Sequence, residues 1–301
     1  MIEVTDATDR RVWLERPPKR VVSLVPSETA SVASLVGTAP LVGRTDFCVE
    51  PVGFVDAVPS VGGTKGFDVA AVKALKPDLV LANKEENSRP LVQSLIEAGL
   101  TVHVSFPCTV DQSLEYIETL CRLLGLTPDS AEPLVACRAE VAAARRAVPK
   151  EPLPVFVPIW KDPWMTFDEG AYASDLLQLC EAHNVFSGRP RRYPLAADLG
   201  RKDASTDAQA HRRDTRYPRI RLEEVLERGA RAVLLPDEPY AFTDDDARAL
   251  ETLSSERSLV VQPVDGKDLF WYGTRLAEAV VRLRAQIAVL RSTCFGSAAH
   301  N

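Results

Sequence analysis

Short apolar runs alternate with polar loops between residues 20 and 107. Five such runs begin near positions 20, 41, 61, 77 and 102, and polar residues follow each of them. An apolar run of about five residues is typical of a strand buried on both faces of a parallel sheet. The polar residues then fall at the carboxyl ends of the strands, where open α/β sheets bind their ligands. The pattern predicts an α/β lobe with a row of ligand-facing loops.

The same alternation returns after Pro152 and predicts a second α/β lobe. A length of 301 residues is sufficient for two domains. The strands expected in the second lobe are residues 155–159, 232–235 and 259–263, and the helices are residues 174–183, a segment from 244, and residues 274–291.

Two predicted helices connect the lobes. Thr109 and Gln112 have the spacing of a capping box, which starts a helix that runs to about Leu124. A second helix is predicted over residues 129–148, and ~20 helical residues are ~30 Å long. The expected organisation is an N-terminal lobe (1–108), connecting helices (109–150), a C-terminal lobe (151–292) and a tail (293–301).

Local signals place several smaller features. Residues 2–15 are expected to form a hairpin. Ser27 is expected to cap a helix that ends before Gly37. His183 is expected to interact with the carboxyl end of the helix over residues 174–183.

Charge and hydropathy exclude several classes of partner. The net charge of −6 argues against nucleic acid, whose phosphates demand a basic surface. No apolar stretch reaches the roughly 18 residues needed to span a bilayer. The acidic start of the chain is unlike a signal peptide, so the chain as given is expected in the cytoplasm as a monomer with reduced cysteines. The alternative is a periplasmic or extracellular protein whose true start lies upstream.

Catalytic and metal-binding templates are missing from the sequence. Residues 62–65 lack the spacing of a P-loop, and the four histidines form no metal-binding pattern, so no metal site and no required cofactor are expected. The remaining candidates for acid–base chemistry are Glu85, Glu86 and Asp237, which follow predicted strands.

Aromatic residues gather in the loops after the predicted strands. Flat apolar rings together with a few polar groups suit a large, flat, partly apolar ligand. The residues expected to bind it are Pro26, Ser27, Glu28, Thr29, Phe47, Asn83, Glu85, Asn87, Trp160, Trp164, Tyr240, Trp271 and Tyr272. The last five are expected to form one wall, on the second lobe.

These motifs resemble a known family. The chain is similar to the class III substrate-binding proteins of ABC importers, also called helical-backbone metal receptors, and its second lobe is similar to their cobalamin-binding branch. The resemblance covers residues 2–290 and is carried by residues 20–29, 43–48, 61–64, 75–80, 160–186, 216–220 and 271–275. It implies two Rossmann-like lobes joined by the long helix of residues 129–148, with the ligand in the cleft between them.

Two features depart from the family pattern. Family members that dock on a permease carry a glutamate early in one helix of each lobe. Glu223 matches that position in the second lobe, whereas the first lobe has Ala70. Together with the missing export signal, this weakens the expectation of a permease partner.

The leading hypothesis is non-enzymatic binding of a cobalamin-like, tetrapyrrole or chelated-metal ligand. An enzyme that modifies such a ligand is the alternative, and a partner-binding module that has lost the ligand is a third. The charged insertion at residues 189–219 is either an exposed segment of mixed charge or a basic contact surface for an acidic ligand or partner.

Overall fold

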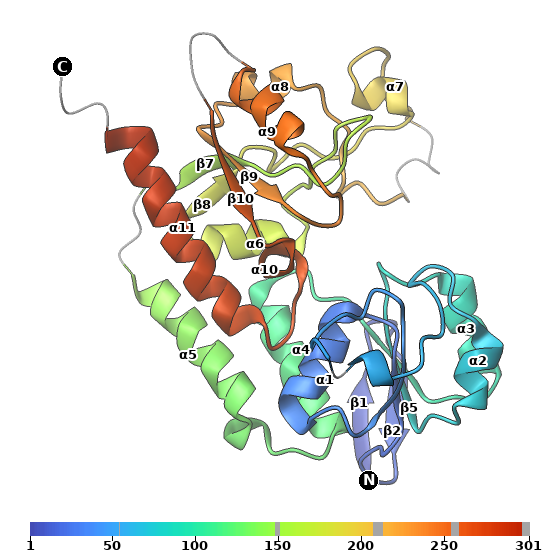
Figure 1. Cartoon of the computed structure of the whole chain (residues 1–301). Helices are drawn as coiled ribbons and strands as arrows, with labels where there is room; N and C mark the ends of the chain where they lie inside the picture. Colours follow the sequence, from blue (N-terminus) through green and yellow to red (C-terminus); the bar gives the residue numbers. More distant parts are fainter. Residues whose placement is uncertain (54, 148–150, 207–212, 254–258, 297–301) are drawn as a thin grey trace. The chain divides into compact units, whose positions relative to one another are not determined.

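The computed structural model describes all residues except 54, 148–150, 207–212, 254–258 and 297–301. The chain divides into two compact units (Figure 1). Unit 1 contains Met1–Glu140 and the short segment Trp271–Ala277, and unit 2 contains Val141–Phe270 and Glu278–Asn301. Unit 1 is therefore built from two separate pieces of the sequence.

Unit 1 contains the predicted parallel sheet. Its strand order is β4-β3-β5-β6, and every neighbouring pair is parallel. The expected amino-terminal hairpin is confirmed as an antiparallel pair, β1 and β2. The strands are β1 (Ile2–Thr5), β2 (Arg11–Leu14), β3 (Val21–Ser23), β4 (Leu41–Arg44), β5 (Leu79–Asn83) and β6 (Val102–Ser105).

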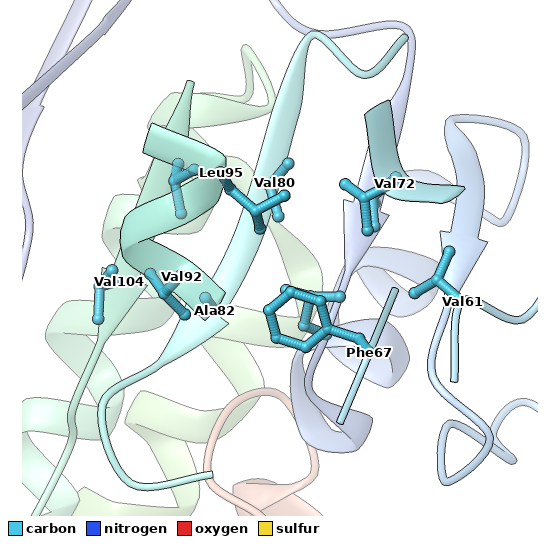
Figure 2. Close-up of a cluster of buried hydrophobic side chains, with 11 residues drawn as sticks. Val61, Phe67, Val72, Val80, Ala82, Val92, Leu95 and Val104 are labelled. Atoms are coloured by element: carbon cyan, nitrogen blue, oxygen red, sulfur yellow. The ribbon is translucent and has the colours of Figure 1, made fainter. Parts of the chain in front are cut away.

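Helices cover both faces of this sheet. Helices α1 and α4 pack on one side, and α2 and α3 on the other (Figure 1). Figure 2 shows Val72 of α2 and Val92 and Leu95 of α3 beside the sheet residues Val80 and Ala82. The helical segments are α1 (Pro26–Val36), η1 (Val55–Ala57), α2 (Val69–Ala74), α3 (Arg89–Glu97), α4 (Val110–Leu123) and η2 (Pro128–Ser130).

Unit 2 repeats the architecture with a second parallel sheet of order β10-β9-β7-β8. The strands are β7 (Leu153–Phe156), β8 (Ala182–Asn184), β9 (Ala232–Pro236) and β10 (Val260–Val264). The helices are α6 (Tyr172–Leu179), α7 (Leu195–Asp198), α8 (Glu223–Glu227), α9 (Asp244–Glu251), α10 (Gly266–Phe270) and most of α11 (Leu276–Gly296). None of the helices in the described part of the chain is long and apolar enough to cross a membrane.

The predicted helix over residues 129–148 is shorter than expected. Helix α5 covers Glu132–Arg146, and residues 128–130 form the separate 3₁₀ turn η2. Pro133 explains the difference, because proline lacks the N–H that a helix interior requires and is tolerated only in the first turn. The last position of the predicted helix, 148, lies outside the described residues.

Other local expectations are corrected. Val25, not Ser27, is the N-cap of α1, and Pro26 occupies its first turn. The run at Val61 forms only isolated bridges, and its neighbour Gly62 has a φ of 104°. The helix expected to reach His183 ends at Leu179, because Glu181 adopts a φ of 66° and turns the chain into β8, where His183 is exposed.

The charged insertion is organised by a buried ion pair. Arg189 Nη1 contacts Asp198 Oδ1 at 2.5 Å, and the side chains are 4% and 0% exposed. Asp198 also accepts hydrogen bonds from the backbone N–H groups of Arg192 at 2.9 Å and Arg219 at 2.7 Å. This pair therefore joins the two ends of the insertion to α7.

We expect Arg189→Ala to lower the free energy of unfolding by about 3 kcal/mol, because it leaves the Asp198 carboxylate buried without its partner. Urea unfolding followed by circular dichroism measures the change. Arg201→Ala, at an exposed position of the same insertion, is the control. Equal stability of the two variants would contradict a structural role for the pair.

Candidate functional site

A cluster of buried polar side chains lies beyond the carboxyl ends of β5 and β6. Glu28, in the first turn of α1, is fully buried. Its Oε1 accepts hydrogen bonds from Ser105 Oγ and, at 2.7 Å, from Tyr272 OH. Asn83 Nδ2 donates to Ser105 Oγ at 3.0 Å and to Tyr272 OH at 2.9 Å. Asn83 and Ser105 meet because they are register partners at the ends of neighbouring strands.

Tyr272 reaches this cluster on the segment Trp271–Ala277, which follows α10. The backbone of this segment is also anchored in unit 1. The N–H of Gly273 donates to Ser113 Oγ at 3.0 Å, and the N–H of Thr274 donates to Ser31 Oγ at 3.1 Å. Gly273 has a φ of 96°, and a Cβ there would lie 2.2 Å from Ser31 Oγ. A glycine is thus required for the close approach.

The environment of Glu28 changes its acidity. Burial raises the pKa of this carboxyl to about 7, and the hydrogen bonds from Ser105 and Tyr272 oppose that rise. The ring of Tyr116 packs edge-on against Tyr272, with the centroids 5.5 Å apart. A carboxyl that titrates near neutral pH therefore lies at the point where the segment Trp271–Ala277 joins unit 1.

Two predicted ligand-binding amides hold the loop that follows β5. Asn83 Oδ1 accepts from the N–H groups of Glu85 at 2.7 Å and Glu86 at 3.1 Å. Asn87 Nδ2 donates to the carbonyls of Leu24 at 3.1 Å and Thr64 at 3.0 Å. These bonds give both amides a structural role, and their part in ligand binding stays a prediction.

The other predicted residues of unit 1 differ in exposure. Pro26, Ser27 and Thr29 are buried in α1, and Thr29 Oγ1 donates to Ser23 Oγ at 2.8 Å. Phe47 is 61% exposed and Glu85 is half-buried. Of this set, Phe47 has the most side-chain surface available to a ligand.

Unit 2 carries a partly exposed group of aromatic rings formed by Trp160, Trp164, Tyr240 and Phe242, which we call the aromatic surface. Trp160 is 46% exposed and packs edge-on against Tyr240, with the centroids 5.1 Å apart. Phe242 lies 4.8 Å from Tyr240 and stacks on Trp164 at 5.7 Å, with 4° between the ring planes. Three predicted residues are thus brought together.

Neighbouring strands create the aromatic surface. The rings come from the loops that follow β7 and β9, which pair in parallel, so their carboxyl ends lie at the same sheet edge. Sequence reasoning missed Phe242, although it follows Tyr240 by two residues in the loop after β9. Lys161 lies beside the surface, with its Nζ 5.9 Å from the Trp164 ring and paired with Asp246.

The expected five-residue wall is divided between the units. Trp271 and Tyr272 belong to unit 1 and are 7% and 5% exposed. The backbone anchors of Gly273 and Thr274 draw both residues there. The sequence alone did not predict that residues 271–277 belong to unit 1, because they follow the strands of unit 2 along the chain.

The described residues contain no group of histidine, cysteine and acidic side chains that could hold a metal ion. Burial lowers the pKa of His103 to about 4, so this imidazole is neutral at physiological pH.

Asp237, a candidate acid or base, accepts a hydrogen bond from the N–H of Gly266 at 2.8 Å. Glu223 and Ala70 are both exposed, in the first turns of α8 and α2.

We expect the buried carboxyl of Glu28 to make stability depend on pH. Its pKa is about 7 in the folded chain against an ordinary value of 4.5, so between these values the unfolded chain loses this proton first. Stability should therefore fall as pH rises, by about 3 kcal/mol in total from this group. Glu28→Gln should remove that part of the slope.

The measurement is urea unfolding at intervals from pH 4.5 to 7.5. Glu115→Gln, an exposed position of α4, is the matched control and should keep the slope of the original chain. If Glu28→Gln and Glu115→Gln gave the same slope, the assigned pKa of Glu28 would be wrong.

Comparison with known proteins adds independent information. A cobalamin-binding protein of Halobacterium salinarum is 35% identical over 147 residues, which make up 48% of this chain and only 39% of that relative. A vitamin B12-binding protein of Pectobacterium carotovorum is 23% identical over 283 residues, covering 91% of this chain and 90% of that protein. A periplasmic heme-binding protein from Roseiflexus, solved in apo form, shares the fold with a TM-score of 0.69 at 16% identity, covering 90% of this chain and 98% of that chain.

These relatives are binding proteins, and they confirm the fold and the resemblance stated from the sequence. The alternative of an enzyme finds no support among them. The periplasmic binding protein family itself matches residues 21–234, from β3 to β9. The chain belongs to the periplasmic binding protein family.

Proposed function

We propose that this protein binds a cobalamin or a related tetrapyrrole without changing it chemically. The observation that carries the proposal is the aromatic surface of unit 2, where Trp160 and Tyr240 offer partly exposed rings. Flat apolar rings favour a ligand that is itself flat and largely apolar. The names of the Halobacterium and Pectobacterium relatives support a corrinoid, and that of the Roseiflexus protein supports a heme as the second candidate.

The other residues expected around the ligand belong to unit 1. Phe47 is 61% exposed and Glu85 is half-buried, whereas Glu28, Asn83 and Asn87 are buried and hydrogen-bonded within the unit. We propose that the aromatic surface contributes most of the affinity.

The location and the partner belong to the same proposal. The description of the matched family and the Roseiflexus structure support a periplasmic or extracellular protein rather than the cytoplasmic one expected from the sequence. A permease of an ABC importer is the proposed partner. The exposed Glu223 would contact it, and Ala70, which lacks the second charge, would leave that docking too weak to stimulate its ATPase.

Trp160→Ala should weaken binding of cyanocobalamin at least tenfold, or about 1.4 kcal/mol, because it removes an exposed ring from the aromatic surface. Isothermal titration calorimetry measures the affinity, with hemin titrated in parallel. Trp13→Ala, which removes a 58% exposed ring from β2, is the control.

Stoichiometric binding with the ligand recovered unchanged supports the proposal. Formation of a product would favour an enzyme. The absence of binding to both cyanocobalamin and hemin would refute the proposed ligand class.

Permease docking can be tested through Ala70. Charge pairs on both units would steer docking, so the original chain should not stimulate the ATPase of a cognate importer. Ala70→Glu should produce stimulation, whereas Ala74→Glu, an exposed position in the last turn of α2, should not. Clear stimulation by the original chain would contradict this expectation.

A further inference from the structure

The insertion at residues 189–219 contains a group of arginines around Tyr193. The guanidinium carbon of Arg191 lies 4.4 Å from the centroid of the Tyr193 ring, and that of Arg213 lies 5.0 Å from it. Arg219 lies in the same region, because Asp198 accepts hydrogen bonds from the backbone N–H groups of both Arg192 and Arg219 at 2.9 and 2.7 Å. Three cationic side chains are thus gathered within one small region of unit 2.

Two acidic side chains of this region already have partners. Asp198 is paired with the buried Arg189, and Asp214 forms an ion pair with Arg216 at 2.6 Å. Within the described ranges, no carboxylate forms an ion pair with Arg191, Arg213 or Arg219. Among the described residues, no ion pair therefore neutralises the positive charge of these three guanidinium groups.

One of these groups also lacks a hydrogen-bond acceptor. The Nε of Arg191 is buried and has no partner among the described residues. A buried donor without an acceptor costs about 1–3 kcal/mol, and more when the group is charged. A bound anion would supply both the acceptor and the missing negative charge.

The backbone around the arginines is fixed by internal hydrogen bonds. The N–H of Arg191 donates to the carbonyl of Thr215 at 2.7 Å, and Tyr193 OH donates to the carbonyl of Asp214 at 2.8 Å. The N–H of Arg219 is held by Asp198. Arg191 and Arg219 therefore project from backbone that internal hydrogen bonds already fix.

We propose that Arg191, Arg213 and Arg219 form a binding site for a phosphate group, either free phosphate or a phosphate monoester. The planar donor fork of arginine matches phosphate oxygens, and a dianion neutralises more of the cluster than a single carboxylate does. The site uses none of the rings of the aromatic surface, so it can fail or succeed independently of the proposed tetrapyrrole binding.

The test is calorimetric titration of the purified protein with sodium phosphate in a phosphate-free buffer at pH 7.5, at ionic strength matched with sodium chloride. A second titration with phenyl phosphate distinguishes a monoester from the free ion. Saturable binding of one phosphate per chain is expected. Arg191→Gln should weaken it at least tenfold, and Arg213→Gln, at an exposed position, should weaken it without endangering the fold.

Arg201→Gln is the matched control, because Arg201 is exposed on the same insertion but outside the cluster. It should bind phosphate as the original chain does. The proposal is overturned if phosphate and phenyl phosphate both fail to bind saturably. It is equally overturned if Arg201→Gln loses as much affinity as Arg213→Gln, since that would mark general charge attraction.

Discussion

The burial of the Glu28 carboxyl is the constraint on which unit 1 depends. A carboxyl group away from water is costly unless it forms hydrogen bonds, and here its Oε1 accepts them from Ser105 and Tyr272. Tyr272 is 244 positions away in the sequence. The chain must therefore return from unit 2 to supply this partner, and the same return places Gly273 and Thr274 against Ser113 and Ser31.

The two units have the same parallel-sheet architecture but carry different surfaces. Unit 1 places polar groups at the carboxyl ends of its strands and uses most of them internally, as the bonds of Asn83 and Asn87 show. Unit 2 places Trp160 and Tyr240 at the equivalent ends, partly exposed. Of the two sets, only the rings of unit 2 keep side-chain surface that an apolar ligand could contact.

Sequence patterns predicted the parts of the fold that local physics determines. Buried runs such as Leu79–Asn83, and caps such as Thr109, act over a few residues and could be read directly. Periodicity alone predicted two helices that were too long. Pro133 moves the start of α5 to Glu132, and the left-handed conformation of Glu181 follows the end of α6. The partners of Glu28 could not be predicted, because they depend on which unit receives the segment that follows α10. The sequence predicted that Trp160, Trp164 and Tyr240 lie together, because the loops after parallel strands share one sheet edge. It did not predict that Phe242 packs among them.

The divided make-up of unit 1 has a consequence for attempts to produce the halves separately. A fragment that ended at Glu140 would contain both edges of the first sheet and all of its strands, yet it would lack Tyr272. Glu28 would then keep the hydrogen bond from Ser105 but lose the one from Tyr272, and the surface that receives Gly273 would face water. A first half that folds by itself would need residues 271–277 fused to its carboxyl end. Truncating the chain after Glu140 therefore does not yield a complete unit 1.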